Sequence, residues 1–469
     1  MRTEKDHIGE VQLADSYPFG INTYRAEQNF CFSHDRIRTD LFESQIMVKK
    51  ACAIANHKAG LLEDHIAEAI IKACDHILDN INTLTPNIHP FQGGAGTSVN
   101  MASNELIANT ALGQLGYQYG DYDKLSPLDH VNLSQSTNDT FSTAVRLALV
   151  KLLKILHKSV ENLLSCLQDK EKDFSDILKI GRTELQDAMP LSLGQEFSAY
   201  ADAVSRFRWR LNKAVDWVRE VNLTGTAVGT GINADRDYSS YVMEELRNIS
   251  KEPLTLSRNL VDATQNIDQI IEVSGIIRTG AVSVKKMSGD LRLLSSGPNC
   301  GLAEIILPSV QAGSSIMPAK TNPVILEAAE QVCLHIIGGD HTISIAASES
   351  NLELVQFLPY IAHILLSNIE IFSNLCRKLS LHIKHIRANK EKINEYIANS
   401  HAVATLLVPV IGYDKMSGVV KEARETKQNI ISIIRRDNLI SEQMLNRLLS
   451  PKVMASPGLP VIEKDETDG

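Results

Sequence analysis

The chain lacks any uninterrupted apolar stretch of about 18 residues, the length that a membrane-spanning helix requires. Its first residues, Met1 to Glu10, are mostly charged or polar and contain no apolar core of the kind found in secretory signal peptides. We therefore expect neither a membrane span nor secretion, and we predict a cytoplasmic location.

Paired cysteines are also missing. The seven cysteines are scattered along the chain, and none forms a CxxC pair. This pattern indicates reduced thiols rather than a disulfide framework or a zinc site. The 14 histidines are equally dispersed. The closest pair, His382 and His385, has helical spacing but no neighbouring carboxylate, so we predict no metal site.

An excess of positive charge is absent as well. The formal net charge is −9, so no global field attracts nucleic acid or an acidic membrane. We predict neither as a partner. An anionic substrate would have to be drawn in by local groups.

Helical periodicity, in contrast, is abundant. Of the 469 residues, 43% are hydrophobic, which suffices for a large core in roughly two to four domains. Strand-like alternation is scarce, so the predicted fold class is mainly α. The apolar spacing predicts helices over about 39–78 with a break at 59–60, and over about 102–116, 140–170, 194–221, 259–295, 324–348 and 353–380, with shorter helices after about 392.

The segment Gly313–Pro323 reads Gly-Ser-Ser-Ile-Met-Pro-Ala-Lys-Thr-Asn-Pro. Its small residues permit tight turns, and Asn322 and Pro323 are typical of the N-cap and first residue of a helix beginning near Val324. A helix start attracts anions, and Lys320 lies beside it, so the loop can hold an anion. A Gly/Ser turn before a helix is common, but the complete pattern is far more specific.

Four further loops that are rich in glycine or short polar residues precede predicted helices. They are Phe91–Glu105, His130–Asp139, Lys179–Pro190 and Asn222–Asn233. Short side chains that donate hydrogen bonds at a helix N-terminus favour binding of a carboxylate. The first of these loops has no lysine, so it does not fit a nucleotide-binding P-loop. The residues 136–139 are also typical caps, but four in a row exceed what one cap requires.

Together, these motifs resemble those of the aspartase/fumarase superfamily, whose members eliminate ammonia, water or an amine from a succinyl compound to leave fumarate. The family signature GSSxMPxKxNP is similar to residues 313–323, and GRTxLQDAxPxTLGQEF is similar to residues 181–197. The resemblance extends over nearly the whole chain. The sequences GGAGTS at 93–98 and LRLLSSGP at 291–298 are closer to those of aspartases than to those of fumarases.

The resemblance implies a three-domain lyase with a long central helical bundle that assembles into the multi-helix core of a homotetramer, with active sites shared between subunits. It implies a mainly helical N-terminal domain over 1–137, the central bundle over 138–392, and a small C-terminal helical domain with an acidic tail over 393–469. It also implies a small dicarboxylate substrate and no organic cofactor.

The same resemblance assigns roles to the polar loops. Ser314 is expected to be the general base, acting as an oxyanion on a mobile loop and giving an enediolate intermediate. One substrate carboxylate would be bound by Lys320, Asn322 and Thr183. The other carboxylate and the leaving group would be contacted by short polar side chains, namely Thr97, Ser136, Thr137 and Ser315 for the carboxylate and Asn138 for the leaving group.

Glu184 stands where fumarases have histidine and many aspartases have histidine or glutamine. Glu327 matches a glutamate that partners this histidine in fumarases. Two neighbouring carboxylates raise at least one pKa, so one could stay protonated and act as an acid. Alternatively, Glu184 stays ionised and binds the substrate's ammonium group, or it simply faces solvent. Both glutamates are therefore candidate catalytic residues.

The expected activity is the reversible elimination of ammonia from L-aspartate to give fumarate. Interconversion of malate and fumarate is the alternative. The sequence at 95–98 and Glu184 argue against it, because fumarases typically have other residues at these positions. A carbon–nitrogen lyase acting on a substituted aspartate is a third possibility, suggested by Glu184 and by Thr321, which is usually valine in the family. A non-catalytic helical scaffold is least favoured, because the signature loop is intact.

Overall fold

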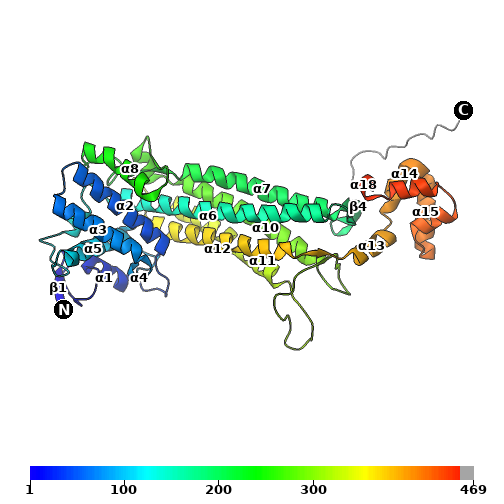
Figure 1. The fold of residues 1–469 in the computed structure, drawn as a ribbon, viewed down its shortest axis with the longest axis horizontal. Coiled ribbons are helices and arrows are strands. Elements are labelled where there is room, and N and C mark those ends of the chain that lie inside the picture. Colours follow the sequence, from blue (N-terminus) through cyan, green and yellow to red (C-terminus); the bar gives the residue numbers. More distant parts are fainter. Residues whose placement is uncertain (455–469) are drawn as a thin grey trace. The chain divides into compact units, whose positions relative to one another are not determined.

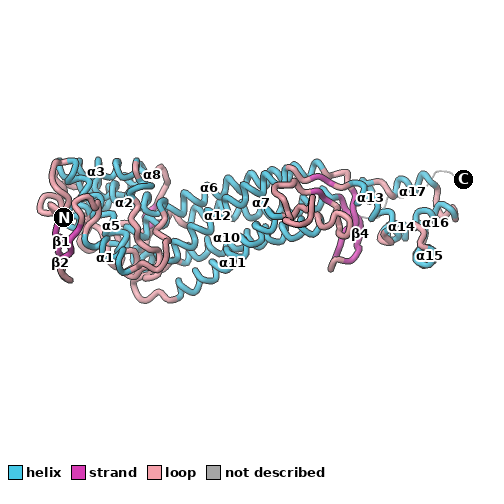
Figure 2. Tube along the Cα trace, turned by 90° about the horizontal axis from the view of Figure 1, so that it is seen from below, coloured by secondary structure: helices cyan, strands magenta, loops and turns pink. Residues whose placement is uncertain are grey.

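The computed structural model describes residues 1–454 (Figures 1 and 2). Most elements are α-helices, and the strands are short and paired two by two, so the prediction of a mainly α fold is confirmed. The chain divides into two compact units. Unit one comprises Met1–Lys158, Trp209–Thr279 and His335–Ser373, and unit two comprises Ser159–Arg208, Gly280–Leu334 and the residues from Asn374 onward. Within residues 1–454, no helix is both long enough and apolar enough to cross a membrane.

Unit one begins with a small helical region that supports the loops of interest. Its elements are β1 (Arg2–Lys5), β2 (Glu10–Leu13), α1 (Ile21–Asn29), α2 (Thr39–Lys58), α3 (Asp64–Asp79), α4 (Ile81–Leu84), α5 (Thr97–Gln114) and the π-helical turn η1 (Pro127–Val131). The later helices α8 (Arg236–Ser250) and α9 (Leu260–Gln265) also belong to this unit. Helix α2 packs against α3 and α8.

The start of α1 is fixed by a buried carboxylate from α5. No side chain of α1's own caps it, and Glu105 instead accepts the backbone N–H groups of Gly20, Asn22 and Thr23 and the hydroxyl of Thr23. Burial raises the pKa of Glu105, and these donors oppose that rise. Helix α1 is therefore tied to α5, whose first residues belong to one of the predicted glycine-rich loops.

Five helices of 25 or more residues supply the bundle segments of both units. They are α6 (Thr137–Asp173), α7 (Leu193–Trp217), α10 (Asp268–Leu294), α11 (Val324–Ser348) and α12 (Leu358–Lys384). Within each unit their segments lie side by side (Figures 1 and 2). The apolar stripe expected on α6 is buried, including Leu147, Leu156 and Leu163.

The helical predictions are confirmed, with two corrections. The segment expected to be one helix over 259–295 is two, because the chain is extended at Asn266 between α9 and α10. Asn322 is not the N-cap of α11. The helix begins at Val324, the Pro323 carbonyl accepts the N–H of Glu327, and the Asn322 side chain bonds to the Gly313 carbonyl instead.

The segment 179–190, expected only as an interruption between helices, is an antiparallel hairpin of β3 (Leu178–Thr183) and β4 (Gln186–Ser192). Its two-residue turn holds Glu184 at φ 52° and Leu185 at φ 62°. Both values lie in the left-handed region that such turns require and that Asn-Gly sequences usually fill. Because neither turn residue is glycine or asparagine, the sequence carried no hairpin signal.

A buried ion-pair cluster fixes the base of this hairpin. Glu304, fully buried, lies 2.8 Å from both Lys179 Nζ and Arg182 Nη1, and the same ammonium lies 2.9 Å from Glu196. The Arg182 guanidinium also lies over the ring of Tyr396. Removing one partner of a buried pair leaves an uncompensated charge, so the position of the hairpin depends on Glu304.

Short helices complete unit two. They are α13 (Lys390–Asn399), α14 (Val403–Ile411), α15 (Tyr413–Thr426), α16 (Ile430–Arg436), α17 (Glu442–Leu448) and α18 (Pro451–Met454). Leu407, Ile433 and Leu445 are buried in their shared apolar core. Two short strand pairs join loops within the units. In unit one, β5 (Glu220–Val221) pairs with β6 (Thr255–Leu256), and in unit two, β7 (Ile305–Ile306) pairs with β8 (Arg387–Ala388). The predicted acidic tail at 457–469 lies outside the described residues.

Glu304→Gln should lower the free energy of unfolding by about 3 kcal/mol, because it removes the buried counter-charge of Lys179 and of the partly buried Arg182, leaving Glu196 to pair with Lys179 alone. Urea unfolding would measure the change. Glu442→Gln is the matched control, since Glu442 pairs with Arg435 at the surface and should cost under about 1 kcal/mol. Equal losses in the two variants would contradict the buried cluster's importance.

Candidate active site

A pocket of about 510 Å³ in unit one gathers residues from three of the predicted loops. Its lining consists mainly of short polar side chains, from Asn100, Met101, Asn132, Ser134–Thr137, Thr226–Val228, Thr230, Ile232 and Asn233. Two predicted substrate-binding residues, Ser136 and Thr137, are therefore in one pocket. The part played by the loop 226–233 had no specific prediction from the sequence.

The start of α6 forms one wall of the pocket. The Ser136 carbonyl accepts the N–H of Thr140, and the Ser136 hydroxyl accepts the N–H of Asn138 at 3.3 Å. In return, Asp139 Oδ1 accepts the N–H of Ser136 at 3.0 Å. This reciprocal arrangement is a capping box. The capping box gives Ser136 and Asp139 a structural role at the helix start. The Thr137 side chain takes no part in it and lines the pocket.

Asp139 also fixes the opposite wall. Its Oδ2 accepts the N–H of Thr226 at 3.0 Å, so one carboxylate joins two loops of the pocket. Asp139 is fully buried, and this burial raises its pKa to about 6, against the lowering effect of the N–H groups of Ser136 and Thr226. The pocket wall thus rests on a carboxylate that costs free energy to keep ionised.

Asn138 and Thr97 are not part of the lining of this pocket. The Asn138 side-chain amide donates to the Ala227 carbonyl at 2.6 Å, and the backbone carbonyl of Asn138 accepts from the Asn222 side chain. Thr97 is the exposed first residue of α5, and its hydroxyl donates to the Gly94 carbonyl at 2.7 Å. Asn100, one turn later on α5, is the residue of this helix start that enters the pocket.

The glycine-rich turn before α5 is sterically required. Gly96 has φ 98°, and a Cβ there would lie 2.4 Å from a ring carbon of Phe141. Gly94 and Ala95 also have positive φ. The turn therefore packs its backbone directly onto the first helical turns of α6.

The signature loop 313–323 belongs to unit two and is closed by its own hydrogen bonds. The Gly313 N–H donates to the Lys320 carbonyl at 2.9 Å, and the Asn322 amide donates to the Gly313 carbonyl at 2.9 Å. A Cβ on Gly313 would lie 2.5 Å from the Lys320 carbonyl oxygen. From Ser315 to Lys320 the side chains are exposed, that of Ile316 by 86%, while Ser314 is half-buried.

Within this loop, Ser314 Oγ accepts two backbone N–H groups. The donors are Met317 at 2.9 Å and Ile316 at 3.2 Å. Donors aimed at a hydroxyl oxygen favour its ionised form, since they stabilise the negative charge that develops there. Lys320 is exposed, and among the described residues it forms no ion pair.

The remaining predicted site residues also belong to unit two. Thr183 and Glu184 are exposed at the tip of the β3–β4 hairpin. Glu327, in the first turn of α11, lies 3.7 Å from Arg292, which also pairs with Glu330 at 2.8 Å. Arg292 was not singled out from the sequence. Among residues 1–454, no ion pair or hydrogen bond joins Glu184 to Glu327, and their proximity stays a prediction.

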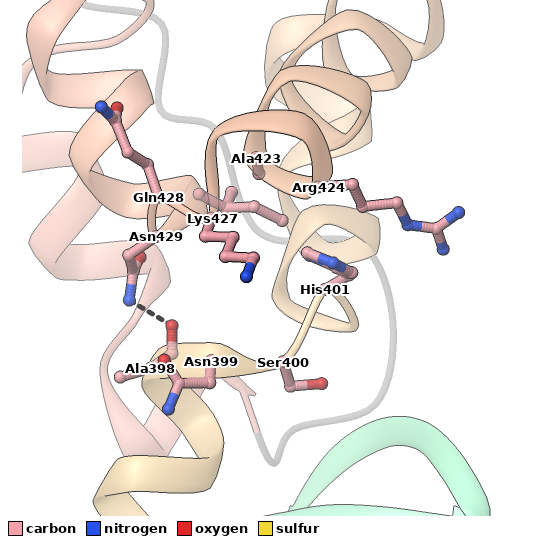
Figure 3. A pocket seen from close by; sticks show the side chains of 10 residues that line it. Ala398, Asn399, Ser400, His401, Ala423, Arg424, Lys427, Gln428 and Asn429 are labelled. Carbon is pink, nitrogen blue, oxygen red and sulfur yellow. Dashed lines mark hydrogen bonds between the residues drawn. The ribbon is translucent and has the colours of Figure 1, made fainter.

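Unit two also has a separate cavity of about 280 Å³, lined by residues 398–401, 423–424 and 427–430 (Figure 3). Lys427 and His401 border it, and it contains none of the predicted site residues. Within the described part of the chain, no cluster of three or more His, Cys, Asp or Glu side chains is arranged to hold a metal ion.

Two family models match the chain, that of the lyase family over residues 9–338 and that of the fumarase C C-terminus over residues 403–456. The chain belongs to this lyase family, and the predicted membership of the aspartase/fumarase superfamily is confirmed. It is therefore an enzyme of the lyase class.

Relatives match over nearly their full length. The aspartate ammonia-lyase of Bacillus subtilis is 41% identical, covering 98% of this chain and 97% of the relative. The aspartate ammonia-lyase of Escherichia coli K12 is 39% identical, covering 97% and 96%. Among solved structures, the fumarate lyase:delta crystallin of Brucella melitensis has a TM-score of 0.93 at 42% identity, covering 97% of this chain and 100% of that one. The class II fumarase of Schistosoma mansoni has a TM-score of 0.88 at 32% identity, covering 97% and 99%.

Asp139 should make a measurable contribution to the pH dependence of stability. Its pKa in the folded protein, about 6, exceeds the ordinary value of 3.8, so the folded state binds this proton more tightly than the unfolded state. Its contribution to the unfolding free energy therefore falls as pH rises from about 4 to 6 and is constant above. Relative to Asp139→Asn, the wild type should gain about 2–3 kcal/mol between pH 7 and pH 4.

Urea unfolding across this pH range would measure that difference. Asp129→Asn is the control, because Asp129 is exposed on η1 and its loss should leave the pH profile parallel to that of the wild type. A parallel profile for Asp139→Asn as well would show that burial does not raise the pKa of Asp139.

Proposed function

We propose that this lyase acts on a carbon–nitrogen bond as an aspartate ammonia-lyase, converting L-aspartate reversibly to fumarate and ammonia. The observation that carries the proposal is the environment of Ser314, whose Oγ accepts two backbone N–H groups within the signature loop. The full-length similarity to aspartate ammonia-lyases of two bacteria supports the choice of substrate.

In the proposed reaction, Ser314 as an alkoxide removes a proton from the carbon next to one substrate carboxylate. The electron pair of the broken C–H bond moves into that carboxylate and gives an enediolate. The same electron pair then forms the C=C bond of fumarate. At the same time the C–N bond breaks, and the nitrogen leaves with the bonding pair as ammonia. A free serine hydroxyl is too weak a base for this step, so the two N–H donors and nearby Lys320 must stabilise the alkoxide.

The other proposed roles follow the resemblance. Charge on the reacting carboxylate would be stabilised by the donors Lys320, Asn322 and Thr183. The second carboxylate would be held by the hydroxyl groups of Thr97, Ser136, Thr137 and Ser315. Asn138 would lie near the leaving ammonia. The pocket in unit one suits this purpose, because short donors there are fixed by buried partners.

We also propose an assembly in which these residues would act together. The carboxylate-binding residues of unit one and the signature loop of unit two would meet in a homotetramer, where each active site takes loops from three subunits. The protein would act in the cytoplasm on a small dicarboxylate, without an organic cofactor and without nucleic acid or a membrane as a partner. The division into domains over 1–137, 138–392 and 393–469 stays part of this proposal.

The second candidate is a fumarate hydratase, which would act on malate. The similarity to the Schistosoma mansoni class II fumarase supports it, but that similarity is lower in identity than those to the aspartate ammonia-lyases. Ultraviolet detection of fumarate formed from L-aspartate, with L-malate in parallel, separates the two. Fumarate from malate alone would overturn the proposed substrate, and no product from either would point to a substituted aspartate or to a scaffold.

Ser314→Ala should lower kcat for aspartate by about 100- to 10,000-fold, because it removes the base while leaving the carboxylate-binding groups in place. KM should change little. Ser309→Ala is the control, since Ser309 is an exposed serine in the same connection. A Ser314→Ala enzyme with near wild-type kcat would exclude Ser314 as the base.

Glu184→Gln should lower kcat/KM for aspartate if Glu184 binds the substrate's ammonium group or serves with Glu327 as an acid, since the amide can neither carry the charge nor donate that proton. Loss of a charged hydrogen bond corresponds to about 10- to 100-fold. Because Glu184 is exposed, thermal stability should be unaffected. Full activity in Glu184→Gln would leave the solvent-facing interpretation.

A further inference from the structure

Lys49 is a fully buried lysine on α2 that forms no ion pair within the described residues. Its ammonium donates to Asn132 Oδ1 and to Gln135 Oε1, both at 2.9 Å. Both amides belong to residues that line the unit-one pocket. A buried cation is costly, and the proposed reaction gives Lys49 no direct role, so its purpose needs an explanation.

Lys49 determines which way the neighbouring amides face. An ammonium group only donates hydrogen bonds, so the oxygens of Asn132 and Gln135 must point toward it. Asn132 Oδ1 then also accepts from Asn100 Nδ2 at 3.2 Å and from Asn104 Nδ2 at 3.1 Å. A flipped Asn132 would direct its NH₂ group at three donors, so only one orientation is possible.

The orientation of Asn132 in turn fixes the hydrogen bond between Asn100 and Thr137. With its nitrogen toward Asn132, Asn100 donates from Nδ2 to Thr137 Oγ1 at 3.1 Å, while its own oxygen accepts from Gln45 and Thr140. Thr137 Oγ1 is therefore an acceptor toward the protein. Among the described residues no acceptor takes its proton, and the side chain lines the pocket.

We propose that Lys49 is a positioning residue that acts through Asn132 and Asn100 to fix the Thr137 hydroxyl as a donor into the pocket, where it binds a substrate carboxylate. This inference rests on the proposed role of Thr137 in the lyase reaction. Because Asn100 occupies one lone pair of this oxygen and no acceptor of the described chain takes its proton, the O–H is available to a carboxylate in the pocket before the ligand arrives.

The positive charge of Lys49 contributes as well. Burial lowers its pKa to about 8, opposed by Cys52, Asp139 and Cys74. Burial raises the pKa of Cys52 to about 12 and also raises those of Cys74 and of Tyr238, which donates to Cys52. Asp139 titrates near pH 6. Between pH 7 and 9.5, Lys49 is thus the titrating group of this cluster, and carboxylate binding should weaken as pH rises through about 8.

Calorimetric binding of succinate to the full-length protein tests the proposal, because succinate has two carboxylates and no amine that titrates in this range. Asn100→Asp replaces the Nδ2 donor by an acceptor, so the Thr137 hydroxyl should turn toward it and away from the pocket. We expect succinate to bind about 10- to 100-fold more weakly in Asn100→Asp and in Lys49→Met. Lys50→Met, which removes an adjacent lysine paired with Asp75, should bind like the wild type.

Two comparisons decide the outcome. In a Thr137→Val background, Asn100→Asp should cause no further loss, whereas a loss that persists would reflect charge repulsion alone and overturn the proposal. Succinate affinity should fall above pH 8 in the wild type and stay flat in Lys49→Met, so parallel profiles would also overturn it. If Lys49→Met does not fold, Asn100→Asp and the wild-type pH profile still decide. Fumarate formation from aspartate by the wild type tests the proposed function separately, and it can succeed while the binding ratios fail.

Discussion

The pocket of unit one depends on a single carboxylate, that of Asp139. Every helix start leaves backbone N–H groups that need acceptors, and α6 satisfies one of them with Asp139 itself, through the N–H of Ser136. The second oxygen of this carboxylate is occupied by the N–H of Thr226. One local requirement of a helix therefore also brings together two distant loops, and the hydrogen bonds that the carboxylate accepts offset part of the cost of burying it.

The signature loop of unit two is built differently. Its ends are joined by Gly313, Lys320 and Asn322, while its middle is exposed and has few contacts outside the loop. Segments of this kind open and close at low free-energy cost. Ser136 and Thr137, which we propose to bind a carboxylate, are thus held by the buried partners Asp139 and Asn100, whereas the proposed base lies on a segment that can move. This division suits an enzyme that binds first and then closes over the substrate.

The sequence predicted the helices well because long apolar periodicity and polar loops at their ends agree. The range expected for α11, about 324–348, is the range observed. The β3–β4 hairpin was missed because Glu184 and Leu185 occupy a turn that usually shows Asn-Gly. For Lys49 the sequence predicted only a place within the helical segment 39–78, since periodicity places a residue on a helix face but does not locate the head group of a long side chain. That Glu184 meets Glu327 stays a prediction, since no hydrogen bond or ion pair joins the two among residues 1–454.

The two ends of the β3–β4 hairpin differ, because the base is held by ion pairs and the tip faces solvent. Its base is fixed by the buried carboxylate of Glu304, while Glu184 and Leu185 at its tip are exposed. Changes at such surface positions usually alter stability by less than about 0.5 kcal/mol. In evolutionary terms, the residue at position 184 can change while the fold stays intact. The restriction that remains is conformational, because the left-handed backbone disfavours β-branched residues at the tip.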